Sequence, residues 1–110
     1  MLIEEFPAVR HGAGHGQRLL DGVVILNGEH RIARWNEPAA GIEGQEILVI
    51  QAKDARLGMY RLGQALFSRE LLQAFKPSSI RTVALCTMDD AVLRPLAEAH
   101  GIEVVVRPRS

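Results

Sequence analysis

The segment Gln45–Lys53 constrains the fold of this chain more than any other stretch. Its centre, Ile47–Ile50, is continuous, apolar and mostly β-branched, which is typical of a strand covered on both faces. Because side chains alternate faces along a strand, Gln51 and Lys53 should project to the same side, with Ala52 opposite. The Gln51 amide and the Lys53 ammonium would then lie near each other at the point where a buried strand reaches the protein surface. The alternative interpretation is an ordinary strand that runs out into solvent.

Composition places the chain among globular proteins. It has 110 residues, of which 47% are hydrophobic and 24% charged, as expected for one soluble domain. Thirteen basic and thirteen acidic residues leave no net charge, so only a local basic face would indicate a nucleic-acid partner. Acidic residues near the N-terminus and the lack of a long apolar run predict a cytoplasmic protein without a membrane segment. The single cysteine, Cys86, excludes an internal disulfide and a multi-cysteine metal site.

The first half of the chain predicts a leader and a hairpin. Residues 1–18 contain Pro7 and a glycine-rich stretch, which predict a flexible leader, with a broken helix at the front as the alternative. A β-branched run over 20–26 ends in Asn27-Gly28, a strong hairpin signal, and residues 30–35 form the expected return strand. Residues 37–44 predict a loop before the central strand.

The second half predicts helices that alternate with strands. Apolar residues at helical spacing predict a helix over 56–75, closed by Pro77. A strand over 80–87 follows, and Thr87 with Asp90 fits an N-cap and its acidic partner at the start of a second helix. That helix stops at Gly101, and residues 102–106 predict the last strand.

This order predicts one α/β domain over residues 1–110. The first three strands can form an antiparallel meander, whereas the helical crossovers before the last two strands imply parallel neighbours. The expected fold is therefore a mixed central β-sheet flanked by helices.

Two further features carry weaker chemical signals. His11 and His15 are four residues apart and could share a helix face as metal ligands, but the surrounding glycines disfavour that helix. Cys86, at a strand end before a helix, could be a nucleophile, but no general base is identifiable beside it.

The order of elements and three short motifs resemble the PD-(D/E)XK nuclease superfamily. Asp21-Gly22 opens a strand, Gln51-Ala52-Lys53 ends another, and Ala84–Thr87 leads to a helix that ends at Ala99-His100-Gly101. The closest likeness is to Mrr-type restriction endonuclease-like domains, in which glutamine commonly stands two positions before the lysine. The similarity spans roughly residues 12 to 106.

The resemblance implies a site for phosphodiester hydrolysis. Asp21, the Gln51 amide oxygen and the Ala52 carbonyl would hold Mg²⁺ or Mn²⁺, with Glu5 as a further acidic ligand. Lys53 would position the attacking water and stabilise the charge of the transition state. Contacts to the nucleic acid would come from five further residues: Tyr60, Gln64, Arg56, Arg18 and His15.

Two functions remain open at this point. The first is a magnesium-dependent endonuclease that acts on DNA and works as a homodimer. The second is a catalytically inactive nuclease-like module that binds nucleic acid or a partner protein. The enzyme needs Asp21, Gln51 and Lys53 around one cation with another carboxylate in reach, whereas the inactive module can have Asp21 turned away or paired with Lys53. A small α/β domain with unrelated chemistry is the third interpretation.

Overall fold

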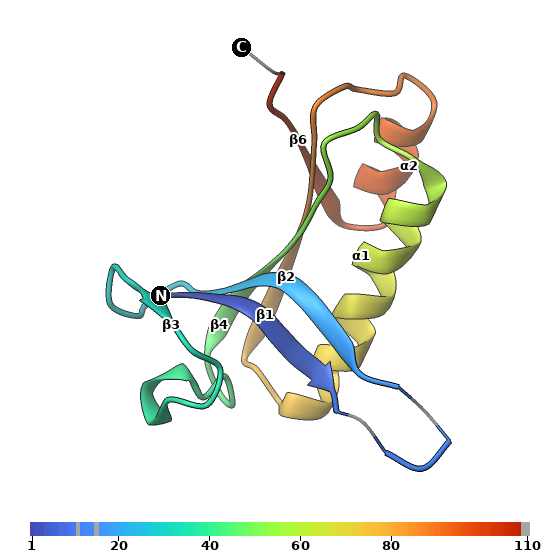
Figure 1. The fold of residues 1–110 in the computed structure, drawn as a ribbon. Coiled ribbons are helices and arrows are strands. Elements are labelled where there is room, and N and C mark those ends of the chain that lie inside the picture. The colour runs from blue at the N-terminus through green and yellow to red at the C-terminus, as the bar shows by residue number, and fades with distance from the viewer. Residues whose placement is uncertain (11, 15, 109–110) are drawn as a thin grey trace.

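The computed structural model describes residues 1–10, 12–14 and 16–108 and has an α/β fold (Figure 1). One mixed sheet of six strands has the order β3-β1-β2-β4-β5-β6. The strands are β1 Leu2–Val9, β2 Arg18–Ile25, β3 Ile32–Ala33, β4 Glu46–Ala52, β5 Ser79–Cys86 and β6 Ile102–Val106. The helices are α1 Met59–Leu72 and α2 Leu93–Ala99, with 3₁₀ turns η1 Pro38–Ala40 and η2 Gln73–Phe75.

The topology joins a meander to two helical crossovers. Strand β2 lies antiparallel to both β1 and β4, whereas β5 and β6 extend the sheet in parallel from β4. The chain reaches β5 through α1 and β6 through α2, as parallel neighbours require. The mixed sheet predicted from the sequence is therefore confirmed, but its meander consists of different segments.

The predicted leader is wrong, because residues Leu2–Val9 form strand β1. Ile3 and Phe6 are both buried in the core, three positions apart, which breaks the alternation by which a strand is recognised. Glu5 between them has φ of 51°. This left-handed residue reverses the alternation, so that apolar residues on either side of it face the core.

The predicted hairpin after Asn27-Gly28 is also wrong. The chain does turn there, and the backbone N–H of Gly28 donates to the Ile25 carbonyl. The return segment, however, forms only the two-residue strand β3, which pairs in parallel with β1. Both edges of β2 are already occupied by β1 and β4. The returning segment therefore joins the outer edge of β1.

The helices agree with the sequence except at one cap. Helix α1 with its 3₁₀ extension lies inside the predicted range and ends before Pro77. The predicted Thr87 cap of α2 is wrong, because the residue before the helix is Val92, and the turn that leads into it is held by Asp90. Its Oδ1 accepts hydrogen bonds from the backbone N–H groups of Val92 and Leu93 at 3.0 and 2.9 Å. An acidic acceptor there also suits the positive end of the helix dipole.

The core lies between the sheet and the two helices. One cluster joins α1, α2, β5 and β6 through Ala65, Ala84, Ala97 and Val104, and a second lies under the meander. Both helices therefore cover the same face of the sheet, as Figure 1 also shows. No helix in the described part of the chain is long and apolar enough to span a membrane.

Candidate functional site

Strands β2 and β4 separate at the positions that the sequence singled out. Their pairing runs from Ile25 opposite Ile47 to Gly22 opposite Ile50. Beyond that point β2 continues along β1, while β4 continues along β5, with Gln51 opposite Ala84. Asp21 and the Gln51 segment therefore lie on neighbouring strands at the start of a fork in the sheet.

The Asp21 carboxylate bridges this fork. Its Oδ2 accepts a hydrogen bond from the backbone N–H of Ala52 at 2.8 Å. Because β2 has turned away, no β2 carbonyl is in place to accept from Ala52, and a backbone N–H left without an acceptor would destabilise the fold. The aspartate side chain thus replaces a missing backbone partner. The structure thus brings the Asp21 carboxylate to the Ala52 backbone.

Arg61 of α1 contacts the same carboxylate. Its Nη1 lies 3.9 Å from Asp21 Oδ2, and the two side chains are 16% and 48% exposed. The Arg61 Nε is buried and has no hydrogen-bond partner among the described residues. The Asp21 carboxylate therefore pairs with Arg61. In the described structure, Lys53 forms no ion pair with Asp21.

Gln51 is held from the helix side. Its side chain is 4% exposed, and its Nε2 donates to Ser68 Oγ at 2.7 Å. Ser68 Oγ in turn donates to the Gln64 backbone carbonyl at 2.6 Å. These bonds orient the amide nitrogen of Gln51 toward α1. The Gln64 Oε1 is buried without a partner within the described structure.

Lys53 lies just after the end of β4. Its backbone N–H donates to the Leu85 carbonyl at 3.0 Å, and the residue is exposed. It lines a hollow of about 390 Å³ at the carboxyl ends of the three parallel strands, together with Ala52, Asp54, Leu85, Cys86, Thr87 and Arg107. The carboxyl ends of parallel strands are where open α/β sheets bind ligands.

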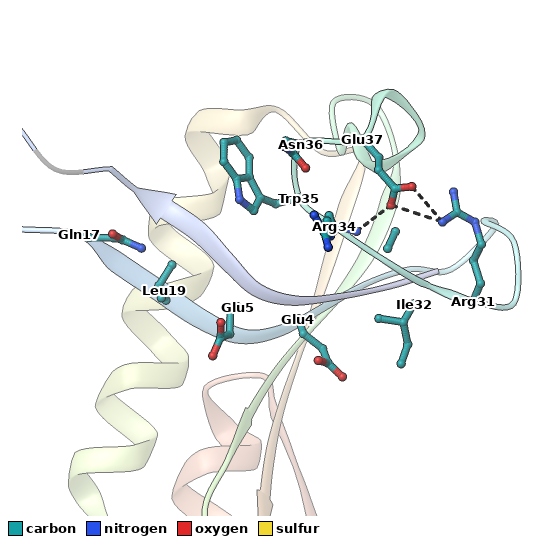
Figure 2. A pocket seen from close by; sticks show the side chains of 11 residues that line it. Glu4, Glu5, Gln17, Leu19, Arg31, Ile32, Arg34, Trp35, Asn36 and Glu37 are labelled. Carbon is teal, nitrogen blue, oxygen red and sulfur yellow. Dashed lines mark hydrogen bonds and ion pairs between the residues drawn. The ribbon is translucent and has the colours of Figure 1, made fainter.

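Glu5 lies on β1 between the pairs Glu4–Gly22 and Phe6–Leu20, one strand away from Asp21, and it lines a different hollow. Figure 2 shows Glu4 and Glu5 on one side of it and Trp35 on the other. Its volume is about 740 Å³, and its lining includes neither Asp21 nor Gln51. The hydrogen bonds drawn there join Glu37 to the Arg31 guanidinium and to the Arg34 backbone. The side chains that line this hollow with Glu5 are therefore not the other predicted metal ligands.

The predicted nucleic-acid contacts come from α1, from the segment before it and from the start of β2. Tyr60, in the first turn of α1, is 76% exposed. Arg56 donates to the Asp89 carbonyl at 3.5 Å, next to a backbone bridge with Met88. Arg18 is exposed at the start of β2. His15 lies outside the described residues, as does His11.

Arg61 is a residue of the candidate site that sequence reasoning missed. Ala65, Ser68 and Leu72 form the buried face of α1, and Arg61 lies one turn before Ala65 on that face. This spacing was present in the sequence. A charged residue in the first turn of a helix is, however, ordinarily exposed, so the pattern did not single out Arg61.

Cys86 does not have the environment of a nucleophile. It is buried against α1 and α2, and this burial, followed by the nearby Asp89 carboxylate, raises the pKa of its thiol. Reactive cysteines have a lowered pKa and access to solvent. The site therefore offers no support for thiol chemistry.

The oxygen atoms at the fork are of the chemical types that bind a magnesium ion. Mg²⁺ binds carboxylate, amide and carbonyl oxygens, and Asp21, Gln51 and Ala52 carry one of each. The set has a single negative charge. Across residues 1–10, 12–14 and 16–108, no group of three or more His, Cys, Asp or Glu side chains is placed to hold a metal ion.

No family model, curated protein or solved structure matches this chain.

Proposed function

We propose that this chain is a metal-dependent nuclease of the PD-(D/E)XK type that hydrolyses phosphodiester bonds in DNA. The observation that supports it is the reach of the Asp21 carboxylate to the Ala52 backbone, where β2 leaves β4. This contact gathers the acidic residue and the Gln-x-Lys segment at one point of the sheet. The order of meander, helix, parallel strand, helix and parallel strand is also the restriction-endonuclease-like arrangement that the resemblance implies.

In this proposal the fork holds Mg²⁺ or Mn²⁺. Asp21 Oδ1, the Gln51 amide oxygen and the Ala52 carbonyl would be the ligands. When bound, the cation would polarise the phosphate and lower the pKa of a water. Lys53, which is exposed beside the fork, would stabilise the negative charge that develops on the phosphate. The Ser68 hydroxyl would keep the Gln51 amide oriented.

Arg61 would have a second role in the same reaction. A cation bound at Asp21 competes with Arg61 for that carboxylate, and the present contact is long at 3.9 Å. The Arg61 Nε is buried, so a contact with DNA would use the terminal nitrogens of the guanidinium. A phosphate oxygen is a suitable acceptor for such a guanidinium. Arg61 would thus bind the DNA backbone beside the scissile group.

The test is cleavage of supercoiled and linear DNA in the presence of Mg²⁺ or Mn²⁺. Lys53→Met and Asp21→Asn should each lower the rate by about 100-fold or more. Lys76→Met is the matched control, because Lys76 is also exposed but lies after η2, and it should cleave like the parent. Unchanged cleavage by both site variants would overturn the proposal.

A second candidate is a catalytically inactive module that binds nucleic acid or a partner protein. Its supporting observation is the state of Asp21, whose Oδ2 is already shared by Ala52 and Arg61. The proposed ligand set of Asp21, Gln51 and Ala52 also contains a single carboxylate. This candidate predicts DNA binding without cleavage in any divalent metal, whereas the nuclease predicts metal-dependent cleavage by the parent.

A further inference from the structure

Strand β6 forms one edge of the sheet and has an unpaired side. Among residues 1–10, 12–14 and 16–108, it is the last strand in the sheet order and pairs with β5 alone. The backbone N–H of Arg107 donates to the Cys86 carbonyl, so the odd-numbered residues direct their backbone groups toward β5. Those of Val104 and Val106 consequently point away from the sheet. Such an edge is a template for another strand.

The sequence of this edge favours pairing. Residues 102–106 read Ile-Glu-Val-Val-Val, and β-branched residues suit strands. The edge has one partial cap, because Arg94 Nη2 approaches the Val104 carbonyl at 3.4 Å. That arginine also pairs with Asp89 and Glu98. It can therefore leave the carbonyl and remain paired.

We propose that β6 pairs with β6 of a second copy of this chain, antiparallel and centred on Val105. A two-fold axis at Val105 places Val104 opposite Val106 of the partner subunit, and both residues direct their backbone groups outward. Each such pair would exchange both N–H···O bonds. The result is one continuous sheet across a symmetric dimer.

Charge complementarity selects this register. With the axis at Val105, Glu103 lies opposite Arg107 of the partner subunit, and symmetry repeats the pair. The Glu103 carboxylate also pairs with Arg81 of its own chain at 2.9 Å, so Arg107 would share an exposed carboxylate with that residue. Opposite charges in directly facing positions stabilise antiparallel pairs. A register centred on Val104 would instead place Glu103 opposite Val105 of the partner subunit. Pro108 lacks an N–H and limits the ladder to the β6 region.

The homodimer expected from the sequence would thus have its interface here, and this inference does not depend on the nuclease proposal. A short ladder buries less area than a standard interface, so association should be weak and concentration-dependent. Sedimentation velocity over a wide range of protein concentration measures it. The parent should shift from monomer to dimer as its concentration rises.

Charge variants test the register. The Arg107→Glu substitution places a negative charge opposite Glu103 of the partner subunit. The Glu103→Arg substitution places a positive charge opposite Arg107 of the partner subunit. Each variant alone should dissociate about tenfold more readily than the parent. An equimolar mixture of the two restores both opposite-charge pairs and should dimerise again. A mixture that stays as monomeric as its components would overturn the proposal.

A backbone variant separates edge pairing from any other contact. Val106→Pro removes an N–H that points away from β5, and edge strands tolerate proline. The variant should keep its thermal unfolding midpoint within a few degrees and lose the dimer. A parent that is monomeric at every concentration, or a Val106→Pro variant that dimerises like the parent, would contradict the proposed interface.

Discussion

Asp21 Oδ2 lies 2.8 Å from the backbone nitrogen of Ala52 and joins two strands at the point where they separate. Asp21→Ala removes this acceptor and should lower the free energy of unfolding by about 1 kcal/mol. Asp21→Asn keeps an oxygen acceptor in the same place and should cost less. Urea denaturation measures both. An alanine variant as stable as the parent would show that Ala52 finds another partner.

The buried bond between Gln51 and Ser68 should couple the two residues. Ser68→Ala leaves the Gln51 Nε2 without its acceptor at a buried position, which should cost about 1–3 kcal/mol. Gln51→Leu combined with Ser68→Ala removes both partners, so the double variant should be less destabilised than the sum of the single variants. A double-mutant cycle by urea denaturation measures the difference, and strict additivity would argue against the bond.

Glu5 has a backbone conformation that costs stability. Its φ of 51° is unfavourable for a residue with a Cβ, by about 1–2 kcal/mol, whereas glycine adopts it freely. Glu5→Gly should therefore raise the unfolding midpoint by a few degrees. Glu4→Gly is the matched control, because Glu4 has no positive φ; it should lower the midpoint. Equal effects of the two substitutions would exclude strain at Glu5.

Acid should destabilise the protein through Glu37 and Asp89. The Arg34 backbone N–H, followed by Arg31, lowers the pKa of Glu37 below its ordinary 4.5, and a hydrogen bond from Arg94 lowers that of Asp89 below 3.8. A lowered pKa in the folded state stabilises the fold above the ordinary value, and this stabilisation is lost as pH falls through the folded-state pKa. The temperature of the unfolding midpoint should therefore decrease as the pH is lowered below about 4.5.

A substitution at Glu37 tests the predicted direction of this pH dependence. Glu37→Gln cannot gain a proton at that position, so its midpoint should fall less steeply with acid than that of the parent. Thermal melts at a series of pH values make the comparison. A steeper fall in the variant would mean that the carboxylate destabilises the folded state.

The sequence predicted the buried half of the sheet well and the outer half poorly. Strands β4, β5 and β6 are short β-branched runs whose burial is visible in their residues. Strand β1 was missed because Glu5 reverses its alternation. The partner of β3 was misjudged because tertiary pairing had already used both edges of β2. Local patterns do not contain that information.

The candidate site also combines residues that the sequence indicated with residues that only the structure reveals. Only the family resemblance grouped Asp21 with the Gln51–Lys53 segment, because the predicted meander put residues 30–35 between their strands, whereas the structure pairs β2 directly with β4. The ion pair with Arg61 and the bond to Ser68 depend on how α1 packs across the fork. That packing appears only in three dimensions.

Binding of Mn²⁺, followed by electron paramagnetic resonance of the free ion, tests the proposed metal site most directly. The parent should bind one ion, Asp21→Asn should lose that binding, and Glu70→Gln should keep it, because Glu70 is an exposed carboxylate elsewhere on α1. A parent that binds no Mn²⁺, or an Asp21→Asn variant that binds it as tightly as the parent, would contradict the account.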